Sequence, residues 1–138
     1  MRMKMKKGLS KEEQKAYLLS KKGRIVTFRY PEPPYVLQGK LFDRFAIKDG
    51  VGGGVVYWNV IDLIKFEGEE REDWLRLTYY RYKKKENRWV FAGQTSLTNP
   101  ISGILELFIK AIKEKDWIRT LFTQVCRQCS KELNVEKL

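Results

Sequence analysis

The spacing of apolar and polar residues changes twice along this chain of 138 residues, and each change predicts a change of secondary structure. Ser10 followed by Glu13 is the pattern of a helix start, and the apolar residues behind it predict a short helix that ends near Gly23. Apolar residues then alternate with polar ones, which is typical of strands. From Thr98 onward the apolar spacing is helical again. The chain is therefore predicted to run helix, strands, helices.

Alternation predicts three strands before an acidic loop at 67–73. The first begins at Arg24 and ends before the prolines of 31–34, because proline has no N–H to donate to a strand ladder. The second covers 36–47 and the third covers 55–67, on either side of a glycine-rich loop. These strands are expected to be antiparallel.

The clearest predicted element is a hairpin over 74–97. Its strands, 74–83 and 88–97, are joined by a polar turn. Alternation places apolar residues on one face of the first strand, and aromatic, cationic and hydroxyl side chains on the other face. We expect this mixed face to be the exposed one.

Two helices are predicted after the sheet, at about 100–114 and 117–133. The first starts at Pro100, a residue favoured at the first helical position because its missing N–H has no partner to lose there. The sequence thus predicts an α+β fold: an antiparallel sheet of about five strands, a short N-terminal helix, and two C-terminal helices packed on one face. Residues 24–138 are expected to form a single domain, preceded by a basic arm and short helix at 1–23.

Composition narrows the class of protein. Hydrophobic residues make up 43% of the chain and charged residues 33%, which fits one soluble domain. There is no histidine, so serine–histidine–aspartate and cysteine–histidine catalysis and histidine-containing zinc sites are excluded. No apolar run has the roughly 18 to 20 residues that span a bilayer, and the start lacks a signal peptide's apolar stretch. We expect a cytoplasmic or nucleoid-associated protein that is not an enzyme, has no catalytic residues and does not bind a membrane.

The net charge of +11 is concentrated in two segments. Residues 1–24 have nine basic and two acidic side chains, and residues 74–99 have six and one. Residues 25–73 are net acidic, with six basic and nine acidic side chains. Such concentrated positive charge indicates a polyanionic partner.

Three other motifs do not predict a functional site. The glycine run 52–54 lacks the lysine and the helix that follow a phosphate loop. Cys126 and Cys129 have the spacing of half a zinc site, but no histidine or further cysteine completes it. The acidic loop 67–73 lacks the spacing of a calcium loop, so a solvated turn is favoured. We therefore expect no metal and no cofactor.

The mixed face of the hairpin carries the candidate site. Single-stranded nucleic acid needs both rings and cations, because unpaired bases stack on aromatic side chains for about 1–3 kcal/mol each while Lys and Arg neutralise phosphates. We expect stacking by Tyr80 and Tyr82; the alternative is that these rings lie under a helix or at a dimer interface. The candidate nucleic-acid-binding residues are Arg76, Thr78, Tyr80, Tyr82, Lys83, Lys84, Lys85 and Arg88.

Segment 75–82, the lysines after it, segment 92–97 and the helix start at 99–100 together resemble the single-stranded-DNA-binding domain of the positive cofactor four family of transcriptional coactivators. The resemblance covers about residues 60–114. It implies a homodimer whose curved antiparallel sheets bind single-stranded DNA, in transcription regulation or genome maintenance. The positions that match the family's strand and loop contacts are Arg76, Thr78, Tyr80, Tyr82, Lys84 and Arg88.

Parts of the chain depart from that family pattern. Ala92 stands where the family usually has a basic residue, and the first sixty residues and the second C-terminal helix have no counterpart. Segment 35–42 resembles the second strand of small Sm-like or SH3-like barrels, which implies RNA or a protein tail as the ligand. Two alternatives are therefore open: a small-barrel RNA-binding protein, and a protein-interaction module whose sheet face or C-terminal helices contact a protein partner.

Overall fold

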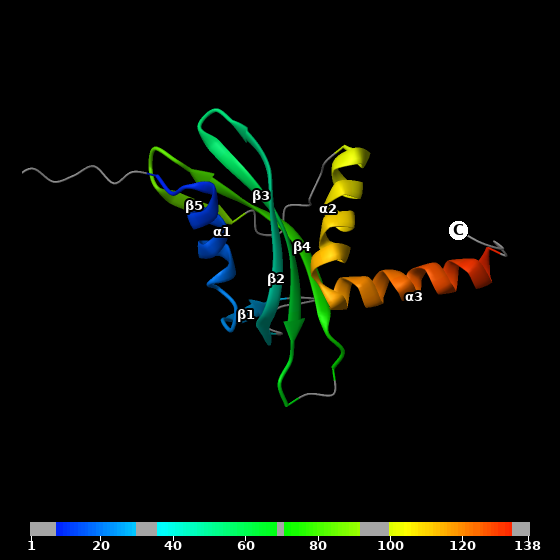
Figure 1. The fold of residues 1–138 in the computed structure, drawn as a ribbon. Coiled ribbons are helices and arrows are strands. Elements are labelled where there is room, and N and C mark those ends of the chain that lie inside the picture. The colour runs from blue at the N-terminus through cyan, green and yellow to red at the C-terminus, as the bar shows by residue number, and fades with distance from the viewer. Residues whose placement is uncertain (1–7, 30–35, 69–70, 92–99, 134–138) are drawn as a thin grey trace, which may run out of the picture. The chain divides into compact units, whose positions relative to one another are not determined.

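The structure is a computed structural model, and it describes residues 8–29, 36–68, 71–91 and 100–133 (Figure 1). The chain divides into two compact units, residues 1–98 and 99–138, which we describe separately. Among the described residues, the first unit contains one helix and five strands, and the second contains two helices. The α+β class predicted from the sequence is confirmed.

The five strands form one antiparallel sheet in which each strand pairs with its neighbours in sequence. They are β1 (Ile25–Phe28), β2 (Leu37–Gly52), β3 (Val55–Lys65), β4 (Trp74–Lys83) and β5 (Arg88–Phe91). The alternation of apolar residues therefore located the strands, although β2 continues beyond residue 47, where it was predicted to end.

A tight turn at Gly53 and Gly54 joins β2 to β3. Both residues have positive φ, +60° and +77°, which the two-residue hairpin turn requires and which glycine adopts without strain. The predicted glycine-rich loop is therefore a regular hairpin turn that extends the ladder to the pair Gly52 and Val55. β2 also carries an extra residue at Phe42, and such a bulge bends the strand.

The predicted hairpin of β4 and β5 is present. Its register pairs Lys83 with Arg88 and Tyr80 with Phe91. Asn87 closes the turn at a φ of +46°, a left-handed conformation that asparagine tolerates better than most residues. Residues 92–97, which the sequence assigns to the second strand, lie outside the described residues.

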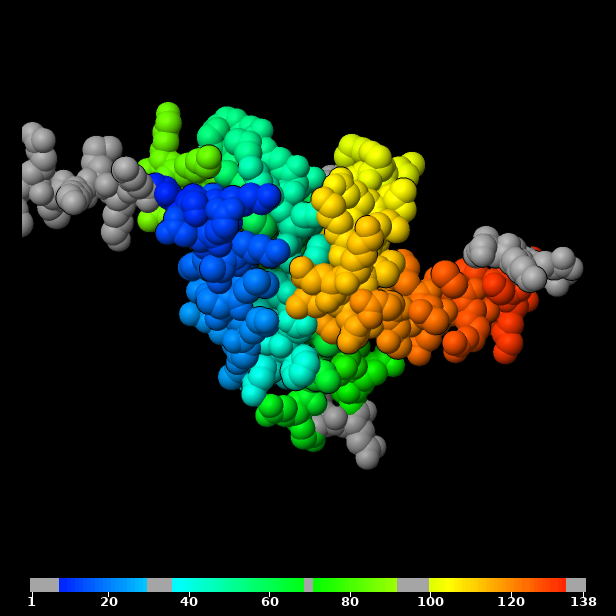
Figure 2. Space-filling view, in the orientation of Figure 1, coloured from blue at the N-terminus to red at the C-terminus, as the bar shows by residue number. Residues whose placement is uncertain are grey.

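Helix α1 (Lys11–Leu19) begins at the predicted capping box, in which Ser10 and Glu13 each accept a hydrogen bond from the other's backbone N–H. The helix lies against one face of the sheet (Figure 2). Buried Gln14 anchors it there by accepting a hydrogen bond from Trp58 Nε1 at 2.8 Å. We call this side of the sheet the α1 face; its packed side chains are Leu18, Ala46, Val56, Trp58, Val60 and Tyr82.

A second apolar cluster lies toward the opposite end of the strands. It consists of Phe28, Leu37, Ile64 and Phe66, with Trp74 packed against it. Gly39 is required here, because a Cβ atom at this position would lie 2.7 Å from Ile64 Cγ2 and 2.8 Å from Phe66 Cε1.

The second unit consists of α2 (Ile101–Glu114) and α3 (Asp116–Glu132), whose bounds lie within one residue of those predicted. Lys115, in an extended conformation, joins them. Phe108 of α2 packs on Phe122 of α3 with ring centroids 5.0 Å apart. That these helices pack on one face of the sheet stays a prediction. None of the described helices has the length and apolar character needed to cross a membrane.

Candidate functional site

A cleft with a volume of about 300 Å³ opens on the α1 face, between α1, the start of β1 and the β4–β5 hairpin. Aromatic and cationic side chains dominate its lining, so we call it the aromatic–arginine cleft. The lining residues are Tyr17, Leu18, Lys21, Arg24, Val26, Leu41, Arg44, Arg76, Tyr80, Trp89 and Phe91.

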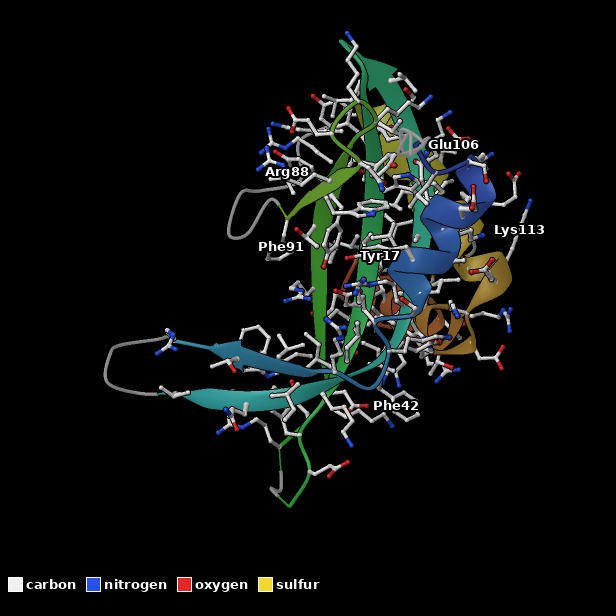
Figure 3. The ribbon with its side chains drawn as sticks, turned by 90° about the vertical axis from the view of Figure 1, so that its left-hand side faces the viewer. Tyr17, Phe42, Arg88, Phe91, Glu106 and Lys113 are labelled. Atoms are coloured by element: carbon white, nitrogen blue, oxygen red, sulfur yellow. The ribbon has the colours of Figure 1, made fainter. Side chains whose placement is uncertain are left out.

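Four aromatic rings line the cleft, and the hairpin register positions three of them. Tyr80 pairs with Phe91, so both rings project from the α1 face, with centroids 5.0 Å apart. Trp89 shares that face and stacks on Tyr17 of α1, with centroids 5.1 Å apart and planes 7° apart. Tyr17 and Phe91 are the most exposed of the four rings, at 38% and 43%, and Figure 3 shows them at similar heights along the strands. Phe91 is the more open of the two, because Tyr17 already has Trp89 stacked on one face of its ring.

Each of these exposed rings has a cation over it. Lys21 Nζ lies 4.2 Å from the ring centroid of Tyr17, and Arg76 Cζ lies 5.2 Å from that of Phe91. Gly23, with a φ of +92°, turns the chain after α1 and brings Arg24 to the start of β1, where it also lines the cleft. The cleft therefore combines flat apolar surface with positive charge.

Buried Asp62 on β3 binds two arginines of the cleft. Arg44 Nε and Nη2 donate to its two oxygens at 2.6 and 3.1 Å, and Arg76 Nε and Nη2 donate to Oδ2 at 3.1 and 2.9 Å. Arg44 also donates to the Leu18 carbonyl and the Tyr80 hydroxyl, which ties α1 and β4 together. Burial acts to lower the pKa of Arg44, but the hydrogen bonds and charge of Asp62 outweigh it and raise that pKa, so Arg44 stays charged.

Of the residues that the sequence proposed, Arg76 and Tyr80 line the cleft. Tyr82 and Thr78 do not, because their exposed fractions are 0% and 1%. The expectation that the mixed face of this strand is its exposed face is therefore wrong at both residues. Tyr82 belongs to the packed α1 face, and its hydroxyl accepts a hydrogen bond from the Leu9 N–H at 2.7 Å and donates one to Asn87 Oδ1.

The four proposed cations of the hairpin turn lie outside the cleft lining. Lys83 and Arg88 alternate with buried Tyr82 and with Trp89, so their side chains leave the sheet from the opposite face. Lys84 and Lys85 are exposed in the turn itself. These cations therefore add positive charge to the hairpin, but they do not line the cleft that contains the aromatic rings.

Sequence reasoning missed most of the cleft because its walls come from distant segments. Tyr17 belongs to α1 and Lys21 to the turn after it, which the sequence predicted as parts of a separate arm, and Arg44 belongs to β2. One signal was present: Asp62 is the single charge in the largely apolar stretch 55–64 of β3. A buried charge of this kind is usually paired with an opposite charge.

The cysteine pair that the sequence set aside does not line the cleft. Cys126 and Cys129 are free thiols on α3, exposed and half-buried respectively. Over the part of the chain that the structure describes, no group of three or more metal-binding side chains is present.

Comparison with known proteins gives no match of any kind: no family model, no curated protein and no solved structure matches this chain. The chemistry of the cleft is therefore the basis for assigning a function.

Proposed function

We propose that this protein binds single-stranded nucleic acid in the aromatic–arginine cleft. The observation that carries the proposal is the lining: four rings and four cations surround one opening of about 300 Å³, and none of the described side chains in that lining is acidic. Phe91 offers the exposed part of its ring to an unpaired base, while Lys21, Arg24 and Arg76 offer positive charge to phosphates.

Other ligand classes fit this lining less well. An aromatic cage for a methylated ammonium group also uses several rings, but the cleft would repel such a ligand, because Asp62 balances only one of its four cations. Duplex DNA keeps its bases paired and stacked on one another, so the exposed rings would gain nothing from it. The lining therefore favours an anion that carries exposed flat rings.

The hairpin turn supports the same function at longer range. Lys84 and Lys85 are exposed, and the chain as a whole has a net charge of +11. Charge of this kind attracts a polyanion before contact and makes its affinity depend on salt.

The biological setting that we propose is narrower than the binding activity and rests on the family resemblance. It is transcription regulation or genome maintenance by a homodimer, in the cytoplasm or at the nucleoid, without catalysis. We favour DNA over RNA as the ligand because the resemblance is to a DNA-binding family.

Fluorescence anisotropy with labelled single-stranded and duplex oligonucleotides across a salt series tests the proposal. We expect tighter binding to the single strand at each salt concentration, with an affinity that falls as salt rises. Failure to bind either probe at low salt would contradict the proposal and favour the protein-interaction alternative. Equal affinity for the two probes would mean that the protein attracts nucleic acid through its charge alone and that its rings do not stack on bases.

A pair of phenylalanine variants locates the site. Phe91→Ala should weaken single-strand binding about tenfold, because one stacked base contributes about 1–3 kcal/mol. Phe42 is the matched control: it is 55% exposed, lies on β2 and is outside the cleft (Figure 3). Phe42→Ala should change the affinity less than about twofold. An equal loss in both variants would show that the cleft is not the binding site.

A further inference from the structure

The two arginines bound to Asp62 differ in how many of their nitrogens the protein uses. All three guanidinium nitrogens of Arg44 donate to protein oxygens, and its side chain is 1% exposed. Arg76 uses only Nε and Nη2, both on Asp62 Oδ2, and its side chain is 22% exposed. Within the described part of the chain, Arg76 Nη1 has no hydrogen-bond acceptor. Arg44 is thus fully engaged, whereas Arg76 has donors left over.

Asp62 also fixes the position of those remaining donors. A guanidinium is planar and has five N–H donors in a rigid arrangement. Because Asp62 occupies the edge formed by Nε and Nη2, the edge formed by Nη1 and Nη2 keeps two parallel donors. Asp62 is itself held in place, since it is 0% exposed and also binds Arg44. Arg76 therefore provides a fixed fork of two N–H groups in the wall of the cleft.

We propose that this fork binds the phosphate group of one nucleotide, while the base of that nucleotide stacks on the exposed part of the Phe91 ring. The inference rests on the proposed function and assigns parts of the ligand to particular residues. Two parallel N–H donors match two oxygens of a phosphate. Phe91 and Arg76 are adjacent, as the 5.2 Å between ring centroid and guanidinium carbon shows. A volume of about 300 Å³, at the small end of ligand sites, suits one nucleotide.

The surrounding charge favours a phosphate over the edge of a base. Guanine also presents two acceptors that an arginine fork can bind. A base edge is neutral, however, and Asp62 neutralises only one of the four cations Lys21, Arg24, Arg44 and Arg76. The remaining positive charge stabilises an anionic ligand group in this cleft.

Two substitutions of Arg76 separate its charge from its fork geometry. Arg76→Lys keeps the charge and removes the fork, and Arg76→Gln removes both. With a short oligothymidylate measured across a salt series, Arg76→Lys should bind about tenfold more weakly with the wild-type salt slope. Arg76→Gln should lose at least as much affinity, and its slope of log K against log salt should be smaller by about 0.7, the value for one phosphate contact. Arg127 is an exposed arginine on α3, so Arg127→Lys and Arg127→Gln are matched controls that should leave both quantities unchanged.

Each outcome decides a different point. Wild-type affinity in Arg76→Lys would overturn the inference, because a point charge would then be sufficient. An unchanged slope in Arg76→Gln would also overturn it, because the arginine would then contact a base. In both cases the wild-type protein still binds the oligonucleotide, so the proposed function stands. Absence of wild-type binding would overturn the proposed function itself. Melting curves identify a variant that is unfolded, and if Arg76→Gln unfolds, the affinity of Arg76→Lys decides alone.

Discussion

Two neighbouring parts of the β4–β5 hairpin carry similar side chains in different surroundings. Next to the turn, Tyr82 is fully buried against Trp89 and the other residues of the α1 face. Two residues earlier, Tyr80 lines the cleft beside Phe91, whose ring is 43% exposed. Both tyrosines project from the same face of the same strand.

The difference arises from the segment that covers the face. Leu9 donates its N–H to the Tyr82 hydroxyl and packs against the cluster that contains this ring. Farther along, α1 leaves the cleft open and contributes Tyr17 to its wall. Alternation within a strand thus decides which face a ring occupies, whereas a distant segment decides whether that ring is core or binding surface.

The largest expected effect tests this contrast at the level of stability. Tyr82→Ala should lower the free energy of unfolding by about 3–5 kcal/mol, because it leaves a cavity in the core and removes both hydrogen bonds of the hydroxyl. Phe91→Ala should lower it by less than about 1 kcal/mol, since the ring is partly exposed. Urea denaturation measures both changes. Similar losses in the two variants would contradict the division of the hairpin into core and cleft.

The second prediction extends the contrast to the two arginines that share Asp62. Arg44→Met should lower the free energy of unfolding by about 3 kcal/mol, because it removes a buried partner of the carboxylate and the contacts to Leu18 and Tyr80. Arg76→Met should cost less than about 1 kcal/mol, because this side chain is partly exposed and Asp62 keeps Arg44.

Urea denaturation of both variants distinguishes the structural role of Arg44 from the binding role of Arg76. Oligonucleotide binding tests the role of Arg76 directly. Arg76→Met should weaken oligonucleotide binding although the protein remains folded. If Arg76→Met instead destabilised the protein as much as Arg44→Met does, Arg76 would be a structural residue.

The sequence was sufficient to predict the order and type of the described elements, although not where β2 ends. Period-two alternation gave the strands, the capping box at Ser10 and Glu13 gave α1, and Pro100 gave the start of α2 within one residue. These signals are local, because each depends on residues that are close together in the chain. Local signals do not say which segment lies over which face, so they could not separate Tyr80 from Tyr82.

The candidate site could be predicted only in part for the same reason. Arg76 and Tyr80 were proposed because they lie in one strand with other cations and rings. Tyr17 and Lys21 reach the cleft only because Gln14 and Leu18 fix α1 against the sheet. That docking depends on long-range contacts, such as the one between Arg44 and the Leu18 carbonyl, which no spacing in the sequence reveals.

The smallest expected effect concerns the start of α1, the helix that packs on the core and contributes Tyr17 to the cleft. The backbone N–H of Ser10, and then its side chain, lower the pKa of Glu13 by bonding to the ionised carboxylate. A carboxylate whose pKa is lower in the folded state stabilises that state fully above its unfolded pKa of about 4.3, and the stabilisation is lost as the pH falls through the folded pKa.

Glu13→Gln should therefore be less stable than wild type near neutral pH, and the difference should shrink as the pH falls toward about 3. Urea denaturation at the two pH values measures it, with Glu12→Gln as the control, since Glu12 is also exposed in the first turn and has no part in the capping box. A difference that is the same at both pH values would show that the ionised carboxylate of Glu13 does not hold the start of α1.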